Sequence, residues 1–283
     1  MGTRNLTMVI DRQGAIKVAQ YGQWDGYPSG NGIEILAFAK DKNNLEKLEK
    51  RLEEVEFITP TCSAKPFFKG YNKRASKNCL TDNDRYFFET FMSRDVGADI
   101  LKNIVNEDYS NMPNELKGTI WLGDETKFGQ DSIFCEWAYC INFQTNKLEC
   151  FDGFNKSKKN QHPRFAIKKP QEGSTGNYYG IRLLKEYDLD NLPDKDDFIE
   201  DLDTLGSEGA GPDAEEEKEE VITFDKETPI APIPTQYGHR SGRHNCPRCK
   251  NQLPSKENAL KKKAPRLYCD RCGQRIDWTS VKD

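Results

Sequence analysis

Leu6-Thr-Met-Val-Ile10 and Ile16-Lys-Val-Ala-Gln-Tyr21 are two apolar, β-branched runs on either side of the turn residues Asp11-Arg-Gln-Gly14. Alternation of apolar and polar residues around a short turn that contains glycine is typical of a β-hairpin. The chain is therefore predicted to open on two paired strands.

A second hairpin is predicted further along the chain. Ser132–Phe143 and Leu148–Phe151 flank the turn Gln144–Lys147, and both runs are rich in residues of high β propensity. The strands of the fold are therefore expected near both ends of its first 187 residues.

Helices are predicted between the two hairpins. Apolar residues recur three and four positions apart in Leu45–Val55, and a similar pattern runs from Asp84 to Val105. Ile33–Ala39 begins another helical pattern, whereas residues 60 to 84, with their prolines, are expected to be irregular. Together these elements predict an α+β domain.

Charge divides the chain into three segments. Residues 1–187 hold 27 Lys or Arg against 25 Asp or Glu, residues 188–220 hold 2 against 15, and residues 236–283 hold 12 against 4. An acidic segment with few apolar residues does not bury enough surface to fold. We therefore expect a near-neutral domain at 1–187, an acidic and proline-containing flexible linker at 188–235 and a basic module at 236–283.

The basic module carries two Cys-x-x-Cys turns, a spacing typical of a zinc site. Four thiolates satisfy a tetrahedral Zn²⁺ ion, which would hold a module of this size folded. The predicted ligands are Cys246, Cys249, Cys269 and Cys272.

The end of this module resembles a known type of zinc ribbon. Tyr268-Cys-Asp-Arg-Cys-Gly-Gln-Arg-Ile-Asp-Trp278 is similar to the short ribbons ending in Cys-x-x-Cys-Gly-Gln-x-[Ile/Leu]-Asp-Trp that occur in small proteins of bacteriophages and prophages. Basic residues around the cysteines favour contact with nucleic acid, with a protein partner or a solvated basic surface without a partner as the alternatives. The expected contacts are Arg248, Lys261, Lys262, Lys263, Arg266 and Arg271.

The rest of the sequence favours a cytoplasmic protein, in the host cytoplasm if it is phage-encoded. No apolar stretch is long enough to span a bilayer, and the unpaired cysteines outside the basic module are typical of a reducing compartment. Cys135 and Cys140 are five residues apart, so on one strand they would point to opposite faces rather than form a reactive pair.

The amino-terminal block resembles a second family. Gly2-Thr-Arg-Asn-Leu-Thr7 with Val18–Gly32, and later Glu136–Phe143 with Leu148–Gly153, are similar to blocks of a largely uncharacterised family in phages, bacteria and fungi. This resemblance implies relatives and not a reaction.

The layout of this block is also similar to that of the amino-terminal-nucleophile hydrolases, in which a strand starts with the nucleophile. Thr3, Arg4 and Asp25 are the candidate catalytic residues of such an enzyme, and Gln23, Trp24 and Tyr27 would line its pocket. The competing interpretation assigns the same residues to turn and core roles, with the glycines of Gly22–Gly32 leading into a helix.

We therefore expect a non-enzymatic, zinc-binding, phage-like protein whose ribbon contacts nucleic acid or a protein. The alternatives are a hydrolase-like enzyme with a site around the Gly22–Gly32 loop and an interaction factor between phage and host.

Overall fold

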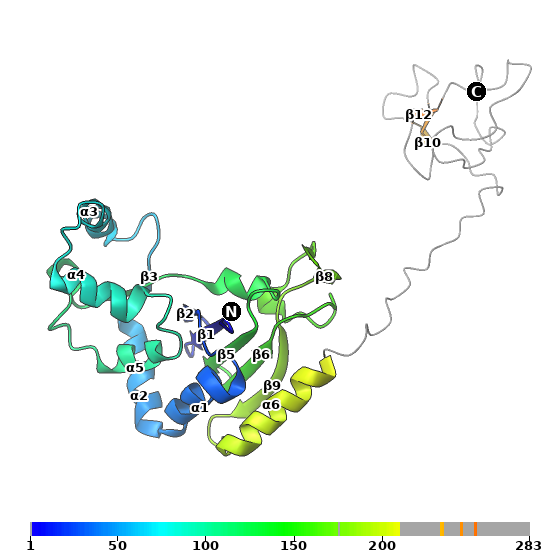
Figure 1. Ribbon diagram of the computed structural model, residues 1–283, viewed down its shortest axis with the longest axis horizontal. Coiled ribbons are helices and arrows are strands. Elements are labelled where there is room, and N and C mark those ends of the chain that lie inside the picture. Colours follow the sequence, from blue (N-terminus) through cyan, green and yellow to red (C-terminus); the bar gives the residue numbers. More distant parts are fainter. Residues whose placement is uncertain (1, 175, 210–232, 235–243, 246–251, 254–283) are drawn as a thin grey trace, which may run out of the picture. The chain divides into compact units, whose positions relative to one another are not determined.

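The computed structural model describes residues 2–174 and 176–209 and three short strands beyond them. It shows an α+β fold built on a five-stranded mixed sheet (Figure 1). In spatial order the strands are β2 (Ile16–Gly22), β1 (Asn5–Ile10), β5 (Trp137–Asn142), β6 (Lys147–Asp152) and β9 (Arg182–Asp188).

Both predicted hairpins are confirmed. β1 pairs antiparallel with β2, and β5 pairs antiparallel with β6. The two hairpins meet through a parallel contact between β1 and β5, in which Met8 lies opposite Cys140. This contact places the start of β1, the end of β2, the start of β5 and the end of β6 at one end of the sheet.

Six helices accompany the sheet in the described part of the chain, and α1 and α6 lie side by side against one of its faces (Figure 1). The helices are α1 (Ile33–Lys40), α2 (Lys42–Arg51), α3 (Lys65–Ala75), α4 (Asp82–Phe87), α5 (Asp99–Asn106) and α6 (Lys195–Gly209). Single helical turns lie at η1 (Pro28–Gly32), η2 (Leu52–Glu54), η3 (Phe88–Met92), η4 (Asn114–Leu116), η5 (Thr126–Gln130) and η6 (Pro163–Phe165).

Smaller sheets complete the fold. β3 (Val55–Phe57) pairs parallel with β4 (Ile120–Leu122), and β7 (Gln171–Gly173) pairs antiparallel with β8 (Gly176–Tyr178).

Both faces of the large sheet are buried. Val9, Tyr139 and Ile141 point toward the helices, and their neighbours Met8 and Cys140 point to the other face. Phe165 and Ile181, from the connections that precede β9, cover this second face. Alternate residues of the strands therefore serve two separate apolar cores.

The structure departs from the expected linker at α6. The segment is acidic, but Phe198 and Leu202 are fully buried in the helix-covered core. These two side chains lie four residues apart and share one face of the helix, while most of the acidic residues occupy the others. The compact amino-terminal unit accordingly extends to Ala214.

The central helices also differ from the expected pattern. Pro66 stands in the first turn of α3, where proline is tolerated, so the segment predicted to be irregular contains a helix. The apolar run after Asp84 is divided between α4 and α5, with a break at Ser93–Ala98 in which Gly97 has a φ of 48°. This break brings Arg94 and Asp95 against the end of β2.

The second compact unit comprises Glu215–Asp283. Its described strands are β10 (Ile233–Pro234), β11 (His244–Asn245) and β12 (Gln252–Leu253), which form one antiparallel sheet. The four predicted zinc ligands lie outside the described residues. No helix among the residues that are described is long and apolar enough to cross a membrane.

Candidate nucleic-acid interface

Buried side chains of the sheet hold the Gly22–Gly32 loop in place. The Trp24 carbonyl accepts hydrogen bonds from the Asn5 side chain at 3.2 Å and the Asn31 side chain at 2.7 Å. The Gly26 carbonyl accepts one from the buried Tyr139 hydroxyl at 3.0 Å. The loop therefore has a fixed shape that the core determines.

The loop also requires its glycines. A Cβ atom on Gly30 would lie 2.2 Å from the Asp25 carbonyl oxygen, and one on Gly26 would lie 2.9 Å from the Thr3 carbonyl oxygen. Asp25 itself has a φ of 52°, a left-handed conformation typical of turns that aspartate adopts more readily than most L-residues. These positions support the structural interpretation of the glycine-rich sequence.

The three candidate catalytic residues make contacts that shape this end of the sheet. The Thr3 carbonyl accepts a hydrogen bond from the Gly26 amide at 2.9 Å. Arg4 forms an ion pair with Glu136 at 3.4 Å. Asp25 accepts a hydrogen bond from the Tyr27 hydroxyl at 3.0 Å, which raises the Tyr27 pKa.

The predicted pocket residues Trp24 and Tyr27 are exposed on the outside of the loop, so the core role that the competing interpretation gives them is wrong. The Trp24 indole donates to Asp95 at 2.9 Å, and Gln23 accepts a hydrogen bond from Tyr21 at 2.7 Å. The rings are thus oriented but uncovered, an arrangement suited to contact with a flat partner.

Four exposed aromatic side chains gather at this end of the sheet. Trp24 and Tyr27 follow β2, Phe134 precedes β5 and Phe154 follows β6, with between 40% and 54% of each residue exposed. We call these four residues the aromatic rim. Large exposed apolar groups that lie together mark interaction sites more often than isolated ones do.

Hydrogen bonds join the loops that carry the rim. Glu136 and Trp137 both donate their amides to the Arg4 carbonyl, the Gly153 amide donates to the Glu136 carbonyl at 2.9 Å and the Phe154 amide donates to the Ser132 carbonyl at 2.7 Å. Arg4 also lies over the Phe134 ring, with its Cζ atom 4.6 Å from the ring centroid. The rim is therefore one connected structure.

Phe154 is held in an unfavourable conformation. Its φ is 51°, which is unusual for a bulky residue. The buried Asn155 fixes the next position, because its side chain donates to the Gly180 carbonyl at 2.8 Å. The backbone of Phe154 is therefore strained while its ring is exposed, so the ring adds little to stability.

A basic segment follows the rim directly. Residues 153–170 contain no acidic residue, and their basic residues are Lys156, Lys158, Lys159, Arg164, Lys168 and Lys169. We call residues 153–170 the basic segment. The charge count over residues 1–187 is close to neutral and conceals this run of positive charge.

The basic segment has a defined fold. Gln161 and Ile167 exchange two hydrogen bonds of 3.2 and 2.8 Å, which folds the segment back on itself. Lys156 lies over the Tyr178 ring at 5.9 Å, and Tyr178 pairs with Gln171 directly after the segment. The exposed ammonium groups available to a polyanion are those of Lys156, Lys158, Lys168 and Lys169.

Arg164 differs from the exposed lysines of the basic segment because its charge is paired within the fold. It forms an ion pair with the buried Glu149 at 2.7 Å, and Glu149 also accepts a hydrogen bond from Asn142 at 2.6 Å. The neighbouring His162 has a lowered pKa, chiefly because burial disfavours its charged form. This cluster anchors the basic segment to β5 and β6 without contributing a free positive charge.

The buried cysteines are poorly suited to nucleophilic chemistry. Burial raises the pKa of Cys135, Cys140 and Cys150. Cys135 and Cys140 share one core cluster, contrary to the expectation of opposite faces. The reason is that Cys135 lies before β5, where the strand is irregular because the Glu136 and Trp137 amides converge on one carbonyl.

The predicted contacts of the carboxy-terminal module lie outside the described residues, as do its cysteines. Within the described ranges, no group of three or more His, Cys, Asp or Glu side chains is placed to hold a metal ion. No protein-family model, curated protein or solved structure matches the chain.

Proposed function

We propose that this protein is a non-enzymatic, cytoplasmic protein that binds single-stranded nucleic acid through the aromatic rim and the basic segment of its α+β domain. The observation that carries the proposal is the exposed, strained Phe154 at the start of a segment that has six basic and no acidic residues. Stacking rings beside a basic track are the usual means of holding unpaired bases.

The charges suggest how a strand would lie. Asp25 and Asp95 stand beside Trp24 and disfavour phosphates there. The exposed lysines follow Phe154 instead. The phosphates would therefore follow the basic segment while bases stack on Phe154 and Phe134, and a duplex, whose bases are already stacked, would bind less well.

The carboxy-terminal module would add a second contact. Cys246, Cys249, Cys269 and Cys272 would bind Zn²⁺ and keep this module folded. The basic residues around them, Arg248, Lys261, Lys262, Lys263, Arg266 and Arg271, would contact phosphates of the same strand. Two linked contacts bind more tightly than either alone when the linker spans them.

The hydrolase alternative would use Thr3, Arg4 and Asp25 on the same end of the sheet. Its nucleophile would be the amino-terminal residue, yet Gly2 precedes Thr3 and a Cβ on Gly2 would lie 2.2 Å from the Trp24 ring. The engagement of the Arg4 and Asp25 side chains and the Thr3 carbonyl in the loop contacts favours binding over catalysis. An interaction factor between phage and host remains compatible with nucleic-acid binding.

The test is a titration of the full chain against a labelled single-stranded oligonucleotide at several salt concentrations. The logarithm of affinity should fall linearly with the logarithm of salt, by about 0.7 for each phosphate contacted. A quadruple variant, Lys156→Glu, Lys158→Glu, Lys168→Glu and Lys169→Glu, should lose at least about tenfold in affinity and show a shallower slope.

Lys47 and Lys50 on α2 offer a matched control, because both are exposed and lie outside the proposed surface. Lys47→Glu with Lys50→Glu should be compared with Lys156→Glu and Lys158→Glu, which make the same change in net charge. Equal losses from the two pairs would show only a general charge effect and would reject the proposed surface. Binding carried entirely by the cysteine module would be abolished by Cys246→Ser and unaffected by the lysine changes.

A further inference from the structure

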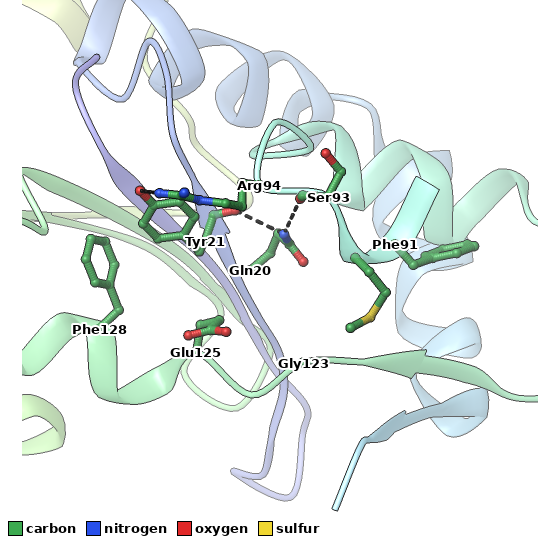
Figure 2. Close-up of a pocket in the computed structure, with 9 residues that line it drawn as sticks. Gln20, Tyr21, Phe91, Ser93, Arg94, Gly123, Glu125 and Phe128 are labelled. Atoms are coloured by element: carbon green, nitrogen blue, oxygen red, sulfur yellow. Dashed lines mark hydrogen bonds between the residues drawn. The ribbon is translucent and has the colours of Figure 1, made fainter. Parts of the chain in front are cut away.

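A cavity of about 340 Å³ lies along the outer edge of β2. Figure 2 shows its wall, which combines the end of β2 with the break before α5 and the turn after β4. The residues that matter here are Gln20, Tyr21, Arg94, Glu125 and Phe128. A cavity of this volume falls within the range of small-molecule sites.

At the cavity, the backbone hydrogen bonds along the outer edge of β2 are interrupted at one residue, and we call this interruption the gap. The Ala19 carbonyl accepts the Glu125 amide at 3.1 Å, and the Gln23 amide donates to the Arg94 carbonyl at 3.0 Å. Tyr21 lies between them on β2, and because Ala19 and Gln23 turn their backbone groups away from β1, the alternation along a strand turns those of Tyr21 the same way. An added peptide strand would need the flanking positions as well, so the gap suits a small ligand and not a strand.

Of the two backbone groups of Tyr21, only the N–H donor is open toward the cavity. The Tyr21 carbonyl accepts the Gln20 side-chain amide at 3.0 Å. The Tyr21 amide faces the same side, and among the residues that the structure describes no acceptor from outside the β1–β2 pair reaches it. An unused backbone donor that faces a cavity is a natural partner for a carboxylate.

Two opposite charges line the same cavity. Arg94 is fixed by the Tyr21 hydroxyl at 3.2 Å and by Gln23, with its guanidinium over the Tyr21 ring. Neither Arg94 nor Glu125 forms an ion pair within the described part of the chain. One ligand with a carboxylate and an ammonium group would match both.

Part of the remaining wall is apolar, and Ser93 adds one polar group. Phe91 is fully buried, Met92 is partly buried, and Phe128 stands edge-on to Tyr21 with ring centroids 4.8 Å apart. An aliphatic or aromatic side chain would be accommodated against these residues, whereas a phosphate would meet the carboxylate of Glu125.

We infer that this cavity binds a free α-amino acid with an apolar side chain, its carboxylate on the Tyr21 amide and Arg94 and its ammonium group on Glu125. The inference does not depend on nucleic-acid binding. It gives the domain a small-molecule site next to the Gly22–Gly32 loop, because Gln23 joins the loop to Arg94 through both its backbone and its side chain.

The experiment is calorimetric titration of the full chain with L-leucine, L-methionine and L-phenylalanine, followed by derivatives of the best ligand. Its N-acetyl form lacks the ammonium group and its amide form lacks the carboxylate. Each derivative should bind at least about tenfold more weakly, the scale of one lost charge-assisted hydrogen bond. Failure of all three amino acids to bind at millimolar concentration would overturn the inference, as would derivatives that bind equally well.

Variants separate the site from a general effect of charge. Glu125 is exposed, so Glu125→Gln should leave the fold intact and reduce amino-acid affinity by about tenfold while binding of the N-acetyl derivative is unchanged. Glu46→Gln on α2 makes the same chemical change at an exposed position away from the cavity and should have no effect. Equal effects of the two changes would reject the site.

Discussion

Substitution of Phe154 should separate stability from binding. The residue has a φ of 51° and is 54% exposed, so its ring contributes little burial while its backbone is strained. A left-handed conformation costs an L-residue roughly 1–2 kcal/mol, and glycine avoids this cost at an entropic penalty of roughly 0.5–1 kcal/mol. Phe154→Gly should therefore be more stable than Phe154→Ala by about 0.5–1 kcal/mol.

Both substitutions remove the same ring, so both should weaken binding of single-stranded nucleic acid equally. Loss of one base-stacking contact of about 1–3 kcal/mol corresponds to a decrease in affinity of about 5- to 150-fold. Urea unfolding followed by tryptophan fluorescence gives the stabilities, and oligonucleotide titration gives the affinities. The reasoning fails if Phe154→Ala is the more stable variant, or if neither variant binds less tightly than the original chain.

Three further predictions concern the domain itself. Asp84→Asn should lower the free energy of unfolding by about 2 kcal/mol, less than the ~3–5 kcal/mol of a fully buried ion pair, because Arg74 is partly exposed. Since Arg74 lowers the Asp84 pKa, this stabilisation is complete above the ordinary value of 3.8 and is lost as pH falls below it. Acid unfolding of the original chain and the variant would reveal the difference. Tyr139→Phe should lower the free energy of unfolding in urea by about 1–3 kcal/mol, because it leaves the Gly26 carbonyl without its buried hydrogen-bond donor. A loss under about 0.5 kcal/mol would argue against the idea that the core holds the Gly22–Gly32 loop in place. Maleimide should label the exposed Cys79 of the native chain much faster than the buried Cys135, Cys140 and Cys150, whose pKa values are raised by burial. Equal labelling rates would contradict this burial.

Local patterns were sufficient to predict the two hairpins. Their strands are short runs of high β propensity on either side of a turn, and each pairs with its neighbour in sequence, so both strand identity and pairing follow from short-range information. The parallel contact between β1 and β5 joins Asn5 to Trp137, and no periodicity within either segment indicates it. This contact creates the end of the sheet where the rim lies.

The helical spacing of apolar residues in α6 was concealed by the acidic composition of the segment. Its acidic residues suggested a linker, yet Phe198 and Leu202 are spaced as one face of a helix and become fully buried. A stripe of apolar residues is sufficient to dock a helix even when its other faces are strongly charged.

The candidate site was partly predictable. Glycine and turn residues indicated the turn at Gly22–Gly32, but they did not indicate that Trp24 and Tyr27 are exposed. The hydroxyl that holds the loop comes from Tyr139, more than a hundred residues later. The basic segment was visible as a run without acidic residues, but its position beside Phe154 depends on the fold. The open edge at Tyr21 depends on strand order and had no sequence signal.

The most direct test of the central claim is photochemical crosslinking of the full chain to a single-stranded oligonucleotide, with the crosslinked peptides identified by mass spectrometry. The proposed surface predicts crosslinks in peptides that contain Phe134, Phe154 and the basic segment, and their loss in high salt. Crosslinks confined to residues 236–283, or absent altogether, would contradict it.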